Sequence, residues 1–496
     1  HEVIVLGIGQ AGTQLSNAFW ELLCLEHGIT SDGRLFSSAD SDESVNSEAF
    51  FLHTQTGKRV PHAVIVDLEP TVIDEIRTGV YKNLFHPDQL ISSMEDASNN
   101  FARGYYTLGR QMCSTILTQI RRATEACDLF HGFFIIHGFG GGTGSGLTSL
   151  MQNYLTTEYT KHSKFQLGIY PGSQFSTGIT EPYNAILALT PSIEQSELSI
   201  LINNDSLYSL CDPSRMAWRT SFVDINRIVA MLFSCLTVSL RFESPLNLDM
   251  IQLETNLVPF PRIHFPMLSY SPMVSPDKSG YGTPSVKEMT QALFDAKNQT
   301  LNVDLTQGKI ISCSIQYRGN ITVQEATKAI MDSKYRRTLR FTDWCPTGIK
   351  LSMSNILPTI PSFFPIGQTR RSALMLMNNS AVSQAVERVG NKFDKLFQKR
   401  AFVHWFVSEG MEEGEFTSAR KEMSALVQDY LEITQAASSK DEKSFGLRVG
   451  EQETMDQPEE LNSQDILPRP NSSIFTTRRK SHDAEDTIND LPVNHL

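Results

Sequence analysis

The sequence has 496 residues, which is too long for a single hydrophobic core and predicts about three domains. Its 55 acidic side chains outnumber the 43 basic ones and give a formal net charge of −12 at pH 7. This charge disfavours a nucleic-acid partner, because such partners require a basic surface. Seven cysteines are scattered without a C-x-x-C pair, a pattern typical of reduced thiols in a cytosolic protein.

The longest apolar run extends from Ile228 to Leu240 and lies between Arg227 and Arg241. It is too short to span a bilayer, so it predicts a buried helix and no membrane partner. No basic segment precedes the first apolar run, and the sequence therefore predicts no signal peptide.

Short apolar runs that end at polar or glycine-rich turns predict the strands of the first part of the chain. They are residues 2–6, 63–67, 133–137, 165–170 and 198–202. Helical patterns lie between them, over 71–79 and 100–126 among others. Strands that alternate with helices predict an α/β fold with a doubly wound parallel sheet, and ligands of such sheets bind at the carboxyl ends of the strands.

Changes in pattern along the chain predict its domain organisation. We expect a nucleotide-binding domain over 1–203, followed by a linking segment over 204–242 that binds the base and contains a core helix. An α+β intermediate domain is expected over 243–380 and a C-terminal helical hairpin over 381–435. Residues 436–496 are expected to form a disordered tail.

The first glycine motif, residues 7–12, reads G-I-G-Q-A-G and follows a predicted strand. Taken alone it favours a dinucleotide-binding fold, which also needs an acidic residue about 20 positions later at the end of a second strand. Asp32 lies near that distance, but its surroundings, I-T-S-D-G-R, predict a turn. This context weakens the interpretation as an NAD-dependent enzyme.

The second glycine motif, residues 140–146, reads G-G-G-T-G-S-G and lies between a predicted strand and a predicted helix. Glycines let backbone amides approach a phosphate closely, and the start of the helix adds a positive end. The motif lacks the G-K-[ST] ending of a P-loop, so it predicts a phosphate-binding loop of another kind.

This motif resembles the signature of the tubulin/FtsZ superfamily, and further stretches resemble the α class of tubulins. They are residues 24–29, 66–79, 85–90, 256–266, 343–348, 358–367 and 399–416. The resemblance covers roughly residues 1–435. It implies a GTP-binding, Mg²⁺-dependent subunit that pairs with β-tubulin in cytoplasmic microtubules and hydrolyses GTP in the tubulin manner.

The resemblance also assigns nucleotide contacts residue by residue. It implies phosphate contacts from Gln10, Gly142, Thr143 and Gly144, with Gly138 at a position where the family has Ser, and a closed far side of the phosphate site formed by Asp96, Ala97, Ser98 and Asn99. It places Thr177 and Glu181 near the ribose, and Asn204, Asn226 and Phe222 against guanine, where the two amides form hydrogen bonds and the ring stacks. It assigns Mg²⁺ binding to Asp67 and Glu69, partly through water. Phe222 stands where the family usually has Tyr.

One departure from the family pattern concerns hydrolysis. The resemblance implies that a helix of this chain presents a catalytic glutamate to the nucleotide of the next subunit, but that position is Gln252. An amide cannot accept a proton, although it can orient a water molecule. Glu254 lies about 200° further around the helix and is expected to point away. We therefore predict slowed hydrolysis, unless another acid acts in its place.

The tail departs as well. Residues 436–496 hold 12 acidic and 7 basic side chains, whereas the family's tails are short and strongly acidic. This tail is expected to recruit motors and microtubule-associated proteins weakly. The alternative is that the tail is a disordered end without a special role. Gln252 and the tail together favour, as an alternative, a specialised subunit that stabilises or caps particular arrays.

Overall fold

The computed structural model describes residues 2–36, 47–172, 176, 178–211, 220–275, 284–334, 339–345, 348–361 and 366–448. The chain divides into two units, His1–Glu442 and Lys443–Leu496. Of the second unit, only the helical residues 443–448 are described, so most of the predicted tail lies outside the described residues.

A parallel six-stranded sheet forms the centre of the first part of the chain, as the alternation of strands and helices predicts. Its order is β5-β4-β1-β6-β7-β8. The strands are β1 (Glu2–Ile8), β4 (Ala63–Asp67), β5 (Leu90–Ser92), β6 (Phe130–Gly138), β7 (Ser163–Tyr170) and β8 (Leu198–Asn203). The strand order reverses between β1 and β6, and such a switch point forms a crevice at the carboxyl ends of the strands. The fold class predicted from the sequence is confirmed.

Helices cover both faces of this sheet because the side chains of β1 alternate between two apolar clusters. Val3 and Val5 pack with α1 (Gly9–Glu26) and α2 (Pro70–Thr78). Ile4 and Leu6 pack with α3 (Leu108–Glu125) and α4 (Thr148–Glu158). The predicted helix 100–126 is not regular, since a π-helical turn, η3 (Arg103–Thr107), precedes α3.

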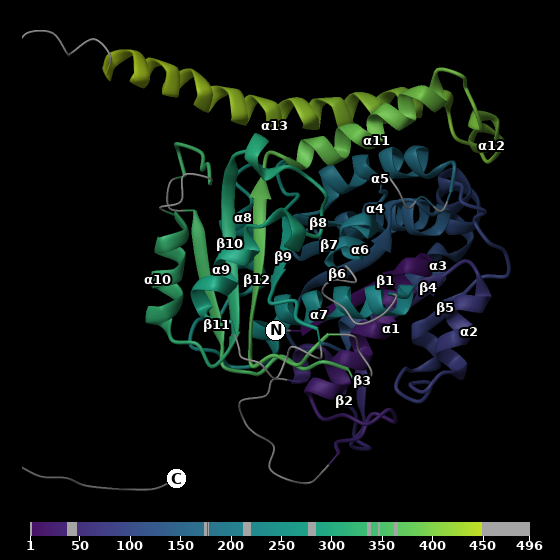
Figure 1. Cartoon of the computed structure of the whole chain (residues 1–496). Helices are drawn as coiled ribbons and strands as arrows, with labels where there is room; N and C mark the ends of the chain where they lie inside the picture. Colours follow the sequence, from purple (N-terminus) through teal and green to yellow (C-terminus); the bar gives the residue numbers. More distant parts are fainter. Residues whose placement is uncertain are drawn as a thin grey trace, which may run out of the picture. The chain divides into compact units, whose positions relative to one another are not determined.

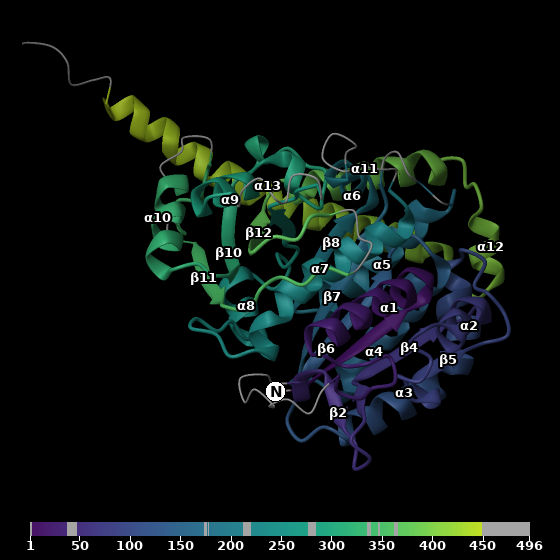
Figure 2. The ribbon, with the colours of Figure 1, turned by 60° about the horizontal axis from the view of Figure 1, so that its bottom comes forward.

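A long core helix, α7 (Phe222–Arg241), lies between α1 and a second sheet (Figure 2). The second sheet is mixed and has the order β11-β10-β12-β9. Its strands are β9 (Met267–Ser271), β10 (Ile310–Gly319), β11 (Ile349–Ser354) and β12 (Arg371–Asn379), and the helices α8 (Met250–Leu257), α9 (Val286–Leu293) and α10 (Val323–Lys334) accompany them. The first part of the chain also contains the short strands β2 (Phe51–His53) and β3 (Arg59–Pro61), the helix α5 (Glu181–Gln195) and the short helix α6 (Asn204–Leu210).

The predicted buried helix at 228–240 is confirmed as part of α7, but its length was underestimated. Among the described residues, α7 is the one helix long and apolar enough to cross a membrane by length and composition. Most of it is buried against the two sheets, as expected for a core helix.

The C-terminal helices form the predicted hairpin. α11 (Val382–Phe397) and α13 (Glu413–Arg448) run beside each other in opposite directions, with the short α12 (Val403–Ser408) between them in the chain (Figure 1). Arg420 of α13 forms an ion pair of 2.8 Å with Asp394 of α11. The helix α13 continues past residue 436 to Arg448, so the prediction that the tail begins at 436 is wrong at that boundary.

A buried ionic cluster joins the two sheets through α7. Glu26, the last residue of α1, lies 2.6 Å from Arg241 at the end of α7 and 2.6 Å from Arg318 on β10. All three side chains are at most 3% exposed. Burial acts to raise the pKa of Glu26, but the two arginines outweigh it and hold this pKa at about 2.

Candidate functional site

A cavity of about 390 Å³ opens at the carboxyl ends of the central strands. It is lined by Gln10, Ala11, Gln14, Leu15, Gly138, Gly140, Gly141, Ile169, Tyr170, Pro171, Gly172, Glu181, Asn204, Leu207, Phe222, Ile225, Asn226 and Val229. These residues come from the switch point between β1 and β6, from the end of β7, and from the first turns of α1, α5, α6 and α7. The cavity therefore occupies the place where doubly wound sheets bind their ligands.

The start of α1 suits an anion. Its N-cap residue, Ile8, is extended and offers no side-chain cap, and the first turn holds no acidic residue. The first backbone N–H groups of a helix point outward and carry a partial positive charge, so a phosphate can satisfy them. Gly9 makes the turn possible with φ of +76°, a left-handed conformation that favours glycine.

The second glycine motif begins as a tight loop over residues 140–142 and continues into a second π-helical turn, η4 (Thr143–Leu147). A β-carbon at Gly144 would lie 2.6 Å from the Gly138 carbonyl oxygen, so this position excludes any larger residue without movement of the backbone. The two π-helical turns also pack against each other, because Gly104 of η3 meets the Gly142 carbonyl oxygen. π-helical turns are found often at functional sites.

His137 supports this loop by a hydrogen bond from the end of β6. This role was not predicted from the sequence. It is fully buried at the end of β6, and its Nδ1 lies 2.7 Å from the Gly144 carbonyl oxygen, to which it donates. Its other ring nitrogen contacts Gln166 of β7. Burial lowers the pKa of His137 to about 4, so the ring is neutral at physiological pH. Its role is therefore to hold the glycine loop in position through hydrogen bonds.

Asn184 is a second supporting residue that sequence reasoning missed. Its Nδ2 donates to the carbonyl oxygens of Asn99 and Gly140, each at 2.8 Å, and its Oδ1 accepts from the Phe101 backbone at 3.1 Å. This one side chain thereby ties α5 to the glycine loop and to the segment 97–101. Its signal in the sequence is a lone amide within the otherwise apolar run 182–189.

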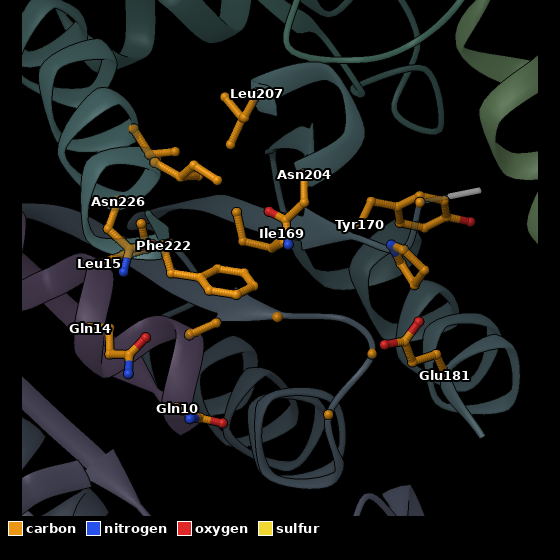
Figure 3. Close-up of a pocket in the computed structure, with 18 residues that line it drawn as sticks. Gln10, Gln14, Leu15, Ile169, Tyr170, Glu181, Asn204, Leu207, Phe222 and Asn226 are labelled. Atoms are coloured by element: carbon orange, nitrogen blue, oxygen red, sulfur yellow. The ribbon is translucent and has the colours of Figure 1, made fainter. Parts of the chain in front are cut away.

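The far end of the cavity presents amides and an aromatic ring. Asn204 begins α6, and Phe222 and Asn226 lie one turn apart at the start of α7. Figure 3 shows the Phe222 ring extending into the cavity between Asn204 and Gln10. A ring face can stack on a base while amides both donate and accept hydrogen bonds, so this end suits a nucleobase.

Glu181 lies at the opposite side of the cavity, at the start of α5. Its carboxylate accepts from the Gly178 backbone at 3.0 Å and from the Ser176 hydroxyl at 2.7 Å. These bonds hold the loop before α5 in place. Thr177, predicted beside Glu181, lies outside the described residues.

Of the predicted magnesium ligands, Asp67 is the last residue of β4 and Glu69 follows this strand, and neither lines the cavity. Asp67 is 2% exposed, and its Oδ2 has no hydrogen-bond partner among the described residues. Burial, with the neighbouring carboxylates of Glu69 and Asp96, raises the pKa of Asp67 to about 7. A buried carboxylate with an oxygen that lacks a hydrogen-bond partner is suited to binding a cation.

Within the described residues, no group of three or more His, Cys, Asp or Glu side chains is arranged to hold a metal. A cation here would therefore depend on one or two carboxylates together with phosphate oxygens and water. Magnesium is commonly bound in this way.

Gln252 lies on α8, on an exposed face and away from the cavity lining. Glu254 is half-buried and accepts from the Ser163 hydroxyl at 3.3 Å, as expected for a side chain that points the other way. Burial and the nearby Glu197 raise the pKa of Glu254.

The structure thus brings together part of the predicted set. Gln10, Gly138, Glu181, Asn204, Phe222 and Asn226 line one cavity. Gly142, Thr143 and Gly144 form the adjoining π-helical turn and its start, and Asn99 contacts α5 through its carbonyl oxygen. Asp67, Glu69 and Asp96 lie beyond the lining, and Gln252 belongs to a separate surface.

A cavity with uncapped helix starts and a glycine loop at the switch point of a parallel sheet defines a nucleotide-binding α/β protein. Two family models match the chain: the GTPase domain of the Tubulin/FtsZ family over residues 2–212, and the tubulin C-terminal domain over residues 261–391. The chain therefore belongs to the tubulin superfamily of GTP-binding cytoskeletal proteins.

Proposed function

We propose that this chain is an α-class tubulin that binds GTP and Mg²⁺ in the cavity described above and assembles with β-tubulin into cytoplasmic microtubules. The observation that carries the proposal is the pairing of this cavity with exposed apolar side chains on two different surfaces. A nucleotide enzyme that acts alone has no need of such surfaces, since exposed apolar patches mark interaction sites.

The first surface borders the cavity. Ile179 is 68% exposed and Trp405 is 59% exposed. The Trp405 carbonyl oxygen accepts from Asn100 at 3.0 Å, and Thr180 donates to the Asn99 carbonyl oxygen at 2.9 Å, so both apolar residues are fixed to the segment 97–101. A subunit that docks here would cover the nucleotide.

The second surface, which we call the α8 surface, consists of Ile251, Phe260 and Trp344. Each is about half exposed, and the Phe260 and Trp344 rings are 5.9 Å apart. α8 and α12 are well separated in both views of the fold (Figures 1 and 2). Two unlike surfaces on one subunit give head-to-tail contacts, which build open filaments rather than closed dimers.

In this proposal Gln10 and the first amides of α1 bind phosphate, together with the loop from Gly142 to Gly144. Asn204, Asn226 and Phe222 bind guanine, and Glu181 with Thr177 lies at the ribose. Asp67 and Glu69 would hold Mg²⁺, directly or through water, and Asp96 adds negative charge beside them. The ion would offset phosphate charge when bound.

The test is purification of the tagged full chain from cells that fold tubulin, followed by measurement of its nucleotide and partner. About one GTP per chain, co-purification of β-tubulin and pelleting with GTP are expected. Asn226→Ala is expected to lower nucleotide content, because a guanine contact is lost. A chain that carries no guanine nucleotide, or that binds NAD without a tubulin partner, contradicts the proposal.

A second candidate is a specialised subunit for stable arrays, and Gln252 favours it. This residue lies next to Ile251 on the α8 surface, where it would face the nucleotide of the adjoining subunit. Its amide can orient water but cannot act as a general base, so we expect slow hydrolysis in the polymer.

Gln252→Glu tests this candidate in single-turnover GTP hydrolysis by assembled polymer. A rise of about 100-fold is expected, the lower end of what a general base contributes. Thr255→Glu is the matched control, because it adds an acid one turn away on the same exposed face. Equal rates for the unmodified chain and Gln252→Glu would rule out this candidate.

A further inference from the structure

The helix α8 contacts both sheets, and its two ends are attached to different ones. Its last residue belongs with the second sheet, because the Leu257 carbonyl oxygen accepts from the Ser312 hydroxyl on β10 at 2.7 Å and from the Asn378 amide on β12 at 3.1 Å. Its start is attached to the central sheet instead. This division matters because the start of α8 carries Ile251 and Gln252, which the proposed function places at an assembly interface.

Two carboxylates hold α8 against the central sheet. Asp249, the N-cap residue of α8, lies 3.2 Å from Nε2 of His131, the second residue of β6. Glu254 accepts from the hydroxyl of Ser163, the first residue of β7, at 3.3 Å. His131 and Ser163 are close neighbours, since Gly132 pairs with Ser163 in the parallel register of β6 and β7. Both contacts therefore lie at the amino-terminal ends of these strands, whereas the cavity lies at their carboxyl ends.

The contact between His131 and Asp249 also determines how α8 begins. Oδ1 of Asp249 accepts from the Met250 backbone N–H at 2.8 Å and faces His131 as well, so one oxygen both caps the helix and binds the sheet. The His131 side chain is only 9% exposed, which limits competition from water. Hydrogen bonding to His131 is the main reason that the pKa of Asp249 lies below its ordinary value, and it outweighs the opposing effect of burial. The carboxylate is therefore charged at neutral pH and is held by the ring.

We propose that His131 is a positioning residue for the α8 surface, because it fixes the N-cap of α8 to the central sheet and so holds Ile251 and Gln252 in place for the adjoining subunit. The inference rests on the proposed function for the role of the α8 surface in assembly. β6 contains both His131 and Gly138, which lines the cavity, so one strand connects the subunit's own cavity to the surface that meets its neighbour. Loss of the His131 contact should free the start of α8 and leave the cavity intact.

The direct test is hydrogen exchange of the full chain with GTP bound, followed in a peptide over residues 246–258. In His131→Leu this peptide should exchange at least about tenfold faster, because a hydrogen bond to a charged group that holds the helix start is lost. His131→Gln should exchange within about threefold of the unmodified chain, because its amide can donate to the carboxylate. Asp249→Ser should exchange within about threefold of His131→Leu, because serine still caps the helix but is too short to reach His131.

His162→Leu is the matched control. His162 precedes β7 at the same edge of the sheet, and its ring packs on Phe130 with 4.7 Å between the ring centroids. This variant should exchange like the unmodified chain. In co-pelleting with β-tubulin and a slowly hydrolysed GTP analogue, His131→Leu should raise the critical concentration at least about fivefold, because the interface is no longer held in one geometry. His131→Gln and His162→Leu should leave it unchanged, and the GTP content should be the same in all variants.

The inference is overturned if the peptide exchanges equally fast in His131→Leu and in the unmodified chain, or if His131→Gln exchanges as fast as His131→Leu. Equal critical concentrations despite different exchange would overturn the link to assembly. If His131→Leu does not fold, Asp249→Ser takes its place in each comparison. Failure of the unmodified chain to pellet with β-tubulin would instead contradict the proposed function, and the exchange comparison would still decide whether His131 positions α8.

Discussion

Removal of Arg318 from the buried ionic cluster is predicted to destabilise the whole first unit. Arg318→Met keeps the apolar stem but leaves Glu26 with Arg241 as its one cationic partner in the cluster. Glu26 keeps its ion pair with Arg241 but loses a charged hydrogen-bond partner, and a hydrogen bond to a charged group contributes about 1.5–3 kcal/mol. Both arginines hold the pKa of Glu26 at about 2, so this pKa should rise towards its ordinary value when Arg318 is removed.

This free energy converts into a modest change in melting temperature. The first unit spans His1–Glu442. With an unfolding entropy of about 2 cal/mol/K per residue, each 1 kcal/mol shifts Tm by about 1 °C. We expect Arg318→Met to lower Tm by about 2–3 °C in scanning fluorimetry at fixed scan rate and saturating GTP.

The control is Arg121→Met, which breaks an exposed ion pair of 3.2 Å with Glu158. Such surface pairs contribute less than about 1 kcal/mol. If Arg318→Met melts at the same temperature as Arg121→Met, the cluster does not stabilise the fold as argued.

The pH dependence of this difference follows from the sign of the shift. The folded pKa of Glu26 lies below its ordinary value, so its stabilising contribution is complete above about pH 4.5 and is lost as the pH falls towards 2. The gap between the unmodified chain and Arg318→Met should be constant from pH 6 to 8 and should narrow below pH 4.5. A gap that grows on acidification contradicts this account.

Three further predictions concern the nucleotide and the assembly surface. Gly144→Ala should lower GTP affinity at least about tenfold, because the β-carbon displaces the loop from Gly138. Its control is Gly414→Ala, where a β-carbon meets open space, and equal GTP affinities of the two variants would refute the argument. Asp67→Asn should weaken the dependence of GTP binding on Mg²⁺, measured by calorimetry with and without EDTA; an unchanged dependence would exclude Asp67 as a ligand. Ile251→Asp should prevent pelleting with GTP while Tm stays within about 1 °C, and normal pelleting would show that the α8 surface is not an interface.

The sequence predicted the central sheet well because its strands are buried on both faces. Such strands appear as continuous apolar runs, and the runs at 2–6, 63–67 and 198–202 all lie within observed strands. β5 was missed, since three residues at a sheet edge carry too weak a pattern. The end of α13 was misplaced because polar composition resembles that of a tail even where the backbone is helical.

The candidate site shows the same division between local and long-range information. Glycine motifs are local, so their position at the ends of β1 and β6 could be predicted from strand patterns alone. Asn184 contacts residues that lie 44 and 85 positions away in the sequence. His137 contacts Gly144, 7 positions away, and Gln166, 29 positions away on the neighbouring strand. Their roles could be identified only once the fold had placed these segments together.

The packing of the two π-helical turns constrains how this chain can evolve. Gly104 and Gly142 lie in separate segments, yet a β-carbon at Gly104 would meet the Gly142 carbonyl oxygen, and one at Gly142 would meet the backbone just before η3. A β-carbon at Gly142 would lie 2.6 Å from the Asn100 backbone nitrogen. No single substitution can relieve this crowding, because enlarging one position requires a shift of both backbones. Lineages that descend from this sequence should therefore retain the two glycines together or lose them together with the loop that they shape.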